Sequence, residues 1–260
     1  TGTLTQNKMM VTHIWSDGNL LKVTGNGYSL EGDFLLEGKQ IKPKELMPNL
    51  FEVASLCNNA TLYQKKEKEG LLRTKSVWGI DGDPTEGALL VSAAKAGVRV
   101  SDLTKVWTRV KEFPFDSERK MMSILVKNSH SAHFIYTKGA PDVLLQKCTH
   151  MVQGGKVVPL TAQLRESVMK TNEELASMAL RNLAFAYREV DSHHISLSES
   201  SLERGLIFLG LMGMIDPPRD EVKGAIQTCH NAGIKTVMIT GDHQTTALAI
   251  ASKLGIKQIG

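Results

Sequence analysis

The spacing of apolar residues along the chain changes after about residue 205. Before that point the apolar stretches are short, and a hairpin signal, Ser16-Asp17-Gly18-Asn19, lies between two of them. Residues 61–80 are charged and show no period, so we expect irregular structure there. Periodicity and capping residues predict helices over 45–59, 84–96 and 162–178, and strands over 106–113, 121–127, 132–137 and 183–187. The short connections favour an antiparallel sheet with flanking helices.

The last part of the chain alternates apolar runs with helical spacing. Residues 206–213 form a continuous apolar run, which is typical of a strand buried on both faces. A second apolar run covers 234–239, and the pattern predicts helices over 219–232 and 244–254. Strand, helix, strand and helix with short links predict a parallel α/β unit. The expected fold class is therefore α/β with an α+β insertion.

Composition and charge exclude several classes of protein. The 260 residues are 42% hydrophobic, which supplies a packed core and argues against disorder. The net charge is only +4 and no dense basic block is present, so a nucleic-acid partner is not indicated. No apolar run approaches the ~20 residues of a membrane span. Three dispersed cysteines indicate a reducing compartment. We expect a soluble, intracellular and monomeric chain.

Two segments have the chemistry of a phosphate site. Thr240-Gly241-Asp242 follows the predicted strand 234–239, at the strand end where open α/β sheets bind ligands. Its alternative interpretation is an ordinary turn in which Asp242 caps the next helix. Thr1-Gly2-Thr3-Leu4-Thr5 has a similar composition, so the two segments together suggest one phosphate site. Neither a Walker A motif nor a Gly-x-Gly-x-x-Gly motif after a buried strand is present.

Four segments in order resemble the large cytoplasmic loop of P-type cation-transporting ATPases. They are Thr1-Gly2-Thr3-Leu4-Thr5, Lys138-Gly139-Ala140-Pro141-Asp142, Asp216-Pro217-Pro218-Arg219 and Thr240-Gly241-Asp242. Three further segments are most similar to the calcium-pump branch, namely 57–59, 82–88 and 113–120. The resemblance covers essentially the whole chain.

The resemblance implies a division of the chain. Residues 1–7 and 215–260 would belong to a phosphorylation domain, a partial haloacid-dehalogenase-like Rossmannoid fold, and residues 8–214 to an inserted nucleotide-binding domain. In the family an Asp-Lys pair precedes Thr-Gly-Thr, and that aspartate is phosphorylated. We therefore expect an excised piece that binds ATP weakly without hydrolysing it. Mg²⁺ is the implied cofactor, and the actuator and transmembrane domains of a pump are the implied partners on the cytoplasmic side of a membrane.

The resemblance also implies roles for single residues. Phe115 would stack on adenine, Glu86 would contact the purine amino edge, and Asp216 would lie at the hinge between the domains. The remaining nucleotide-binding positions are Lys120, Lys138, Gly139 and Arg181, with Arg119 a weaker candidate, and the phosphoryl site would comprise Thr1, Thr3, Thr240, Gly241 and Asp242, with Mg²⁺ held by the Thr1 backbone.

Each of these residues has a structural alternative. Phe113 and Phe115 are two apart and would both face one side of a strand as core residues. Glu86 would complete a capping box with Asp83. Lys138 would be a solvated surface lysine, Arg181 would meet a helix dipole, and Asp216 would start a helix. Two other functions also stay open: a soluble haloacid-dehalogenase-like phosphatase with a large cap, and a non-enzymatic nucleotide-sensing module.

Overall fold

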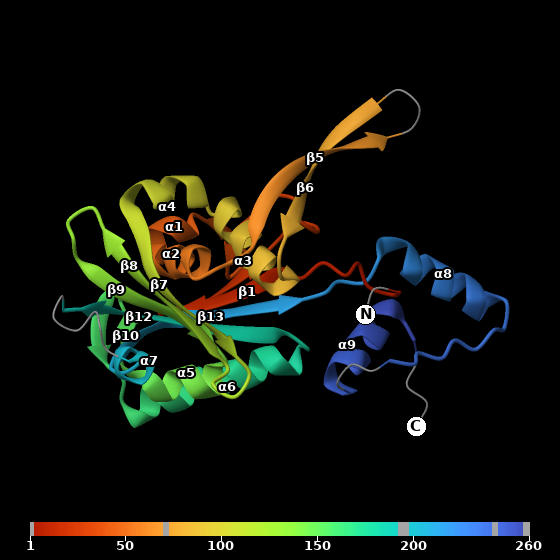
Figure 1. Ribbon diagram of the computed structural model, residues 1–260. Coiled ribbons are helices and arrows are strands. Elements are labelled where there is room, and N and C mark those ends of the chain that lie inside the picture. Colours follow the sequence, from red (N-terminus) through yellow and green to blue (C-terminus); the bar gives the residue numbers. More distant parts are fainter. Residues whose placement is uncertain (1–2, 70–72, 192–197, 241–243, 257–260) are drawn as a thin grey trace.

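The computed structural model describes residues 3–69, 73–191, 198–240 and 244–256, and Figure 1 shows their arrangement. The strands are β1 (Met10–Ser16), β2 (Asn19–Val23), β3 (Phe34–Leu36), β4 (Lys39–Ile41), β5 (Thr61–Glu69), β6 (Arg73–Asp81), β7 (Trp107–Asp116), β8 (Met121–Asn128), β9 (His133–Gly139), β10 (Cys148–Gln153), β11 (Lys156–Pro159), β12 (Arg181–Val190) and β13 (Leu206–Ile215). The helices are α1 (Pro43–Leu46), α2 (Pro48–Leu56), α3 (Pro84–Lys95), α4 (Val100–Val106), α5 (Pro141–Lys147), α6 (Ala162–Ser177), α7 (Glu199–Leu202), α8 (Asp220–Asn231) and α9 (Gln244–Leu254).

One large sheet forms the centre of the molecule. Its main path is β4-β3-β2-β1-β13-β12-β9-β8-β7, and all of these neighbours run antiparallel. The expected antiparallel sheet is therefore confirmed. β10 pairs with β13 in parallel, and β11 pairs with β10. The apolar run 206–213 becomes β13 in the middle of this sheet. The prediction that this run begins a parallel α/β unit was therefore wrong.

Helices cover both faces of the sheet and enclose a core on each side (Figure 1). One core packs α2 and α3 against the sheet, and the other packs α5 and α6 against the opposite face. β13 contributes to both, since Met212 belongs to the first core and Leu211 to the second. The prediction that this strand is buried on both faces is confirmed.

Local signals in the sequence specify the starts of helices α3 and α6 and the first hairpin turn. The Asp83 carboxylate accepts hydrogen bonds from the first-turn amides of α3, and the Thr161 hydroxyl accepts one from the amide of Leu164 in α6. Asp17 and Gly18 form the turn of the predicted β1–β2 hairpin. The predicted helix 45–59 is instead two pieces, because α1 ends at Leu46 and a new helix, α2, begins at Pro48.

Residues 61–80 are regular, contrary to expectation. β5 and β6 pair from Thr61↔Asp81 to Glu69↔Arg73 and form a two-stranded ribbon that projects from the body (Figure 1). Residues 61–66 are largely exposed. A strand segment whose side chains are mostly exposed needs no apolar alternation, so the periodicity on which strand prediction depends is absent there.

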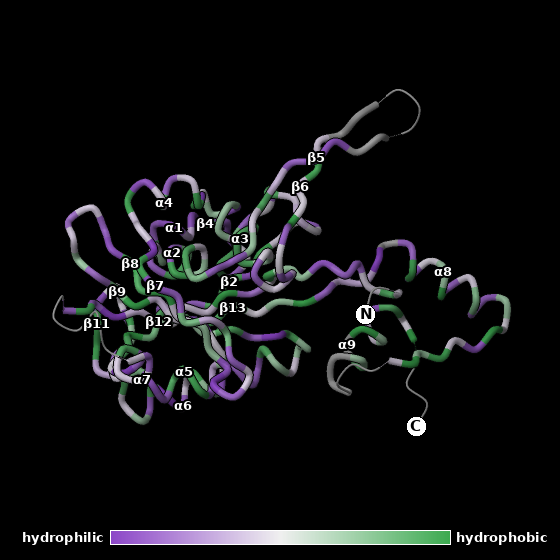
Figure 2. The backbone as a smooth tube through the Cα atoms, in the orientation of Figure 1, coloured by the Kyte–Doolittle hydropathy of each residue, from purple (hydrophilic) through white to green (hydrophobic). Residues whose placement is uncertain are grey.

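The second predicted parallel strand, 234–239, does not form. This segment links α8 to α9 without regular structure, and Figure 2 shows hydrophobic stretches along it. Ile239 is 94% exposed and Val237 is 67% exposed. A strand of this kind is stable only between paired neighbours, and none of the described strands pairs with it. The helices on either side, 219–232 and 244–254, are present as predicted.

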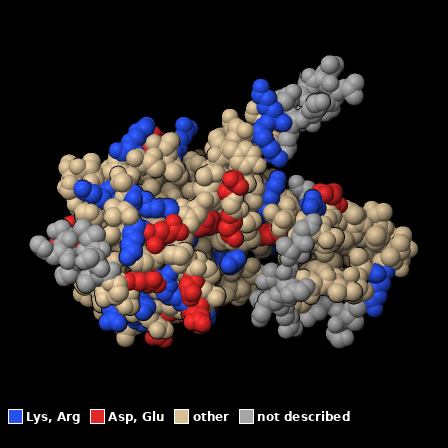
Figure 3. Space-filling view, in the orientation of Figure 1, with Lys and Arg blue, Asp and Glu red and all other residues tan. Residues whose placement is uncertain are grey.

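Charges of both signs are mixed over the face shown in Figure 3. Basic residues collect on the projecting β5–β6 ribbon, whereas acidic residues lie near the middle of this view. The face carries no broad field of one sign, in keeping with the net charge of +4.

Candidate functional site

A buried ion pair connects the sheet to helix α3. Lys138 lies on β9 between Met122 of β8 and Phe185 of β12, and both neighbours belong to the core under α2 and α3. Lys138 is 6% exposed, and its Nζ lies 2.5 Å from Oε1 of Glu86. The structure thus brings together two of the predicted residues. It also rules out the alternative that Lys138 is a solvated surface lysine.

The carboxylate of Glu86 does not close a capping box. The Asp83 Oδ1 accepts hydrogen bonds from the amides of Thr85 at 2.7 Å and Glu86 at 3.3 Å, which is the cap that the sequence predicts. The Glu86 Oε2, however, accepts from the amide of Asn59 at 3.0 Å. Its two oxygens therefore serve Lys138 and the segment after α2.

Sequence analysis missed the network that extends from this pair. The Arg109 guanidinium donates to the carbonyl oxygens of Leu56 at 2.6 Å and Asn58 at 2.7 Å, and to Oδ1 of Asn59 at 2.7 Å. It also pairs with Glu112 on its own strand at 2.9 Å. Arg109 thereby fastens the end of α2, and with it the Glu86 contact, to edge strand β7. The residues are far apart in sequence, so no local pattern reveals the network.

Cys57 lies beside this network without belonging to it. Its side chain is fully buried, and its Sγ donates to the carbonyl of Met122 at 3.5 Å. Burial raises the pKa of the Cys57 thiol to about 11, although the positive charges of Lys138 and Arg109 oppose that rise. The thiol is therefore neutral and packs as a small apolar group.

Phe113 and Phe115 lie in different environments despite their spacing. Phe113 is 5% exposed, whereas Phe115 is 63% exposed. The pairing of β7 with β8 is irregular between Phe113 and Asp116, which breaks the alternation that would place both rings on one side. The alternative that both are core residues is wrong, because Phe115 presents its ring to solvent.

Phe115 lies at the same end of the sheet as Lys138. The ladder joins Phe113 to Ser123 on β8 and Ser123 to Thr137 on β9, so only β8 separates the two segments. Adjacent strands are ~4.8 Å apart, which puts the two backbones about 10 Å from each other. An exposed aromatic ring and a buried cation thus share one edge region of the molecule.

Gly139 allows β9 to approach the turn that follows Phe115. A Cβ at Gly139 would lie 2.7 Å from the carbonyl oxygen of Lys120, and that oxygen accepts a hydrogen bond from the amide of Ala140 at 3.0 Å. Lys120 has a positive φ of 51°, and its side chain is exposed. The close approach at Gly139 is therefore to the protein's own backbone.

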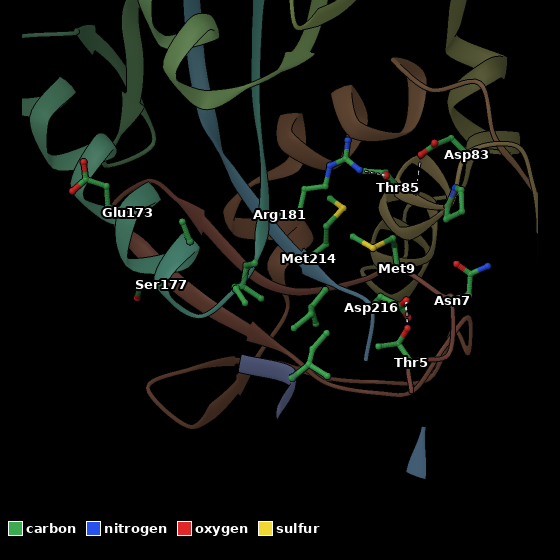
Figure 4. Close-up of a pocket in the computed structure, with 16 residues that line it drawn as sticks. Thr5, Asn7, Met9, Asp83, Thr85, Glu173, Ser177, Arg181, Met214 and Asp216 are labelled. Atoms are coloured by element: carbon green, nitrogen blue, oxygen red, sulfur yellow. Dashed lines mark hydrogen bonds between the residues drawn. The ribbon is translucent and has the colours of Figure 1, made fainter. Parts of the chain in front are cut away.

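A second group of predicted residues lines a cleft of about 830 Å³, drawn in Figure 4. We call it the hinge cleft; it is lined by Thr5, Asn7, Met9, Asp83, Pro84, Thr85, Glu173, Ala176, Ser177, Ala179, Leu180, Arg181, Met214, Ile215, Asp216 and Ile250. Arg181 Nη1 donates to Thr85 Oγ1 at 3.3 Å. Because Thr85 precedes Glu86 on α3, the first turn of this helix connects the cleft to the buried ion pair.

Asp216 joins two chain segments beside the hinge cleft. Its Oδ2 accepts from the hydroxyl of Thr5 at 2.6 Å, and its Oδ1 accepts from the amide of Lys8 at 3.0 Å. Figure 4 shows Thr5 and Asp216 facing one another. Both carboxylate oxygens therefore hold the crossing of residues 4–8 and 215–219.

Comparison with known proteins gives the family. The family model described as "P-type ATPase, cytoplasmic domain N" matches residues 47–221, about two-thirds of the chain. This chain belongs to the P-type ATPases. A calcium-transporting ATPase of Bacillus subtilis is 44% identical over 98% of this chain and 28% of its own length. A cation-transporting ATPase of Synechocystis is 40% identical over 100% of the chain and 28% of its own length, and a calcium-transporting ATPase of Bacillus cereus is 41% identical over 99% and 26%.

This P-type ATPase chain thus spans a little over a quarter of the curated relatives it matches. The mostly antiparallel sheet with few helices agrees with the domain that the family model describes. None of the helices in the described residues is long and apolar enough to cross a membrane.

The predicted phosphoryl site is only partly within the described residues of this P-type ATPase. Thr3 and Thr240 are exposed, and the strand that should end at Thr240 is absent. Thr1, Gly241 and Asp242 lie outside the described residues. The described part also contains no group of three or more His, Cys, Asp or Glu side chains arranged to hold a metal ion.

Proposed function

We propose that this chain is the ATP-binding part of a P-type cation pump and that the adenine stacks on Phe115. The observation that supports the proposal most strongly is a 63% exposed aromatic ring at the same sheet end as the buried Lys138–Glu86 pair. Stacking of a base on an aromatic ring contributes ~1–3 kcal/mol and needs an accessible ring face. Phe115 meets that requirement, whereas Phe113 does not.

The charges near the ring suggest a division of roles. Glu86 balances the charge of Lys138, so this pair is suited to hydrogen bonds with the base and sugar more than to neutralising phosphates. Lys120 is exposed and, among the described residues, forms no ion pair, while Arg181 contacts only a hydroxyl through its Nη1. We assign these two cations to the phosphates. The fork of Arg181 fits phosphate oxygens, and Lys120 supplies a compact positive charge.

For the whole protein we propose a pump that couples ATP-driven aspartyl phosphorylation to cation transport, with Ca²⁺ as the cargo that the relatives' names suggest. Residues 8–214 would form the nucleotide-binding domain. Residues 1–7 and 215–260 would contribute to a haloacid-dehalogenase-like phosphorylation domain on the cytoplasmic side of the membrane. The actuator and transmembrane domains would be the partners. We propose that the 260 residues on their own bind ATP without hydrolysing it.

Mg²⁺ has no identified binding site among the described residues, which contain no group of three or more metal-ligating side chains. Thr1 and Asp242, where the resemblance places the ion and the phosphoryl group, lie outside these residues. We therefore derive no role for the ion from them. The alternative of a soluble phosphatase is disfavoured, since the family model that matches describes a cytoplasmic domain of P-type ATPases and the relatives are transporters by name.

The proposal is tested by titrating the 260-residue chain with ATP while recording two-dimensional amide NMR spectra. We expect saturable shifts near Phe115, Glu86 and Lys138, with a dissociation constant of about 0.1 to a few mM. Phe115→Ala is expected to weaken binding by roughly 5- to 150-fold, the equivalent of one lost stack. Because the ring is exposed, the variant should keep a native spectrum.

Val110→Ala is the matched control, since Val110 is also an exposed apolar residue of β7, at 47%. It should bind ATP like the parent chain. A well-dispersed spectrum with no shifts at about 10 mM ATP, where even a −3 kcal/mol interaction is visible, contradicts the proposal.

A further inference from the structure

Glu203 is a buried acid that the nucleotide site described above does not use. It follows α7 directly and is 2% exposed. Its Oε1 accepts hydrogen bonds from the hydroxyl of Ser123 on β8 and from Nη1 of Arg119, the latter at 2.7 Å. Ser123 is itself 2.9 Å from the hydroxyl of Thr137 on β9, and both are fully buried. The carboxylate is therefore fixed against β8 and, through Ser123, against β9.

Arg119 links this fixed carboxylate to the residue before Phe115. While Nη1 pairs with Glu203, Nη2 donates to the carbonyl oxygen of Pro114 at 2.6 Å. Nη1 also pairs with Glu199 on α7. The planar guanidinium holds its arms in a fixed geometry, so the place of the Pro114 carbonyl depends on that of the Glu203 carboxylate.

Phe115 has few other restraints. β7 is the edge strand of the sheet, and its ladder with β8 is interrupted between Phe113 and Asp116. The turn that follows is closed locally, because Oδ1 of Asp116 accepts from the amides of Glu118 and Arg119 at 2.9 Å each. These local bonds shape the turn. The Ala140 amide holds the Lys120 end of the turn through the Lys120 carbonyl, and Arg119 connects the Pro114 end to Glu203.

We propose that Glu203 is a positioning residue that orients Phe115 for the nucleotide base through Arg119. The inference rests on the proposed function, since it assumes that Phe115 receives the base. A ring held in its binding orientation loses less conformational entropy when a ligand stacks on it. Without the Glu203 charge, Arg119 keeps only its pairing with the more exposed Glu199, so the Pro114–Phe115 peptide is held less firmly.

The test is a double-mutant cycle on ATP affinity, measured by amide NMR titration of the 260-residue chain. Glu203→Gln is expected to weaken ATP binding by roughly 3- to 30-fold, within the range of coupling between residues in one network. In the Phe115→Ala background the same change should alter affinity by less than about twofold, because the ring through which it acts is absent. A general loss of structure would instead weaken binding in both backgrounds.

Arg119→Lys provides a second variant in case Glu203→Gln fails to fold. It keeps a positive charge beside Glu203 but removes the arm that reaches Pro114, so it should also weaken ATP binding only when Phe115 is present. The matched control is Arg165→Lys, because the Arg165 guanidinium similarly reaches two main-chain carbonyls, those of Leu145 and Cys148. This control should leave ATP affinity unchanged.

The outcomes separate the two proposals. If the parent chain binds ATP and Phe115→Ala weakens it, but the Glu203 and Arg119 changes have no effect or the same effect in both backgrounds, the positioning role is wrong and the proposed function stands. If the parent chain is folded and does not respond to ATP, the proposed function fails and the positioning role fails with it.

Discussion

At the scale of single residues, removing one member of the Lys138–Glu86 pair should destabilise the fold more than removing both. Glu86→Gln leaves the Lys138 cation, 6% exposed, without a counter-charge. Breaking one side of a buried pair costs about 3–5 kcal/mol, and we expect the lower end because the Glu86 side chain is 16% exposed. Urea unfolding of the variant measures this loss. The double variant Glu86→Gln with Lys138→Met should have a free energy of unfolding closer to that of the parent chain. If its loss of stability equals the sum of the losses of the single variants Glu86→Gln and Lys138→Met, the structure is contradicted.

Thiol reactivity gives a second prediction at this scale. Burial raises the pKa of Cys57 to about 11 and that of Cys148 to about 12, while Cys229 is only partly buried. At pH 8 a thiol with a pKa of 11 is about 0.1% thiolate, and the thiolate is the reactive form. Ellman's reagent should therefore label one thiol rapidly in the native chain and all three in denaturant. Rapid labelling of two or three native thiols would show that the cores are open.

At the scale of elements, the close approach of β9 to the turn after Phe115 depends on Gly139. Gly139→Ala would place a Cβ 2.6 Å from Cγ of Met121 and 2.7 Å from the carbonyl oxygen of Lys120. Overpacking of this kind typically costs 1–3 kcal/mol, so we expect a lower midpoint of urea unfolding. We also expect weaker ATP binding, because the displaced turn follows closely after Phe115.

Gly224→Ala is the matched control for that substitution. Gly224 lies inside α8 with open space where a Cβ would be, and alanine favours a helix over glycine by about 1 kcal/mol. The same glycine-to-alanine change should therefore raise the stability to urea or leave it unchanged. Equal destabilisation by the two variants would mean that the contact at Gly139 is not the cause.

The elements that sequence predicted correctly are those with local signals. The cap at Asp83 and the hairpin turn at Asp17-Gly18 depend on neighbouring residues, and both are present. The β5–β6 ribbon was missed because its residues 61–66 are largely exposed and show no apolar alternation. Strand 234–239 was wrongly expected because a buried parallel strand is stable only when neighbouring strands pair with it. The same division applies to the site. Sequence and resemblance supplied Glu86 and Lys138 as candidates, but their contact, and the link from Glu203 to Phe115, exist only after strands distant in sequence are paired.

At the scale of the whole molecule, two chain segments connect the sheet body to the part that holds α8 and α9 (Figure 1). Gln6 donates its amide to the carbonyl of Pro217 at 3.0 Å, and Arg219 donates its amide to that of Leu4 at 2.9 Å. The core beyond them is small, built on Ile226, Ile250 and Leu254. The crossing of these segments, held by Asp216, therefore controls how firmly the smaller part is attached.

Asp216→Ala should loosen this crossing without unfolding the body. It removes the acceptor of two hydrogen bonds, from Thr5 and from the amide of Lys8. Bonds to a carboxylate contribute about 1.5–3 kcal/mol each, so hydrogen exchange at the amides of Gln6 and Arg219 should accelerate about tenfold or more. Exchange in central strand β13 should stay unchanged, because that strand is held by its own neighbours. Glu173→Ala, which alters the opposite wall of the hinge cleft, should leave the crossing as it is. If exchange accelerates in β13, or does not accelerate at the amides of Gln6 and Arg219, Asp216 supports the body and not the connection.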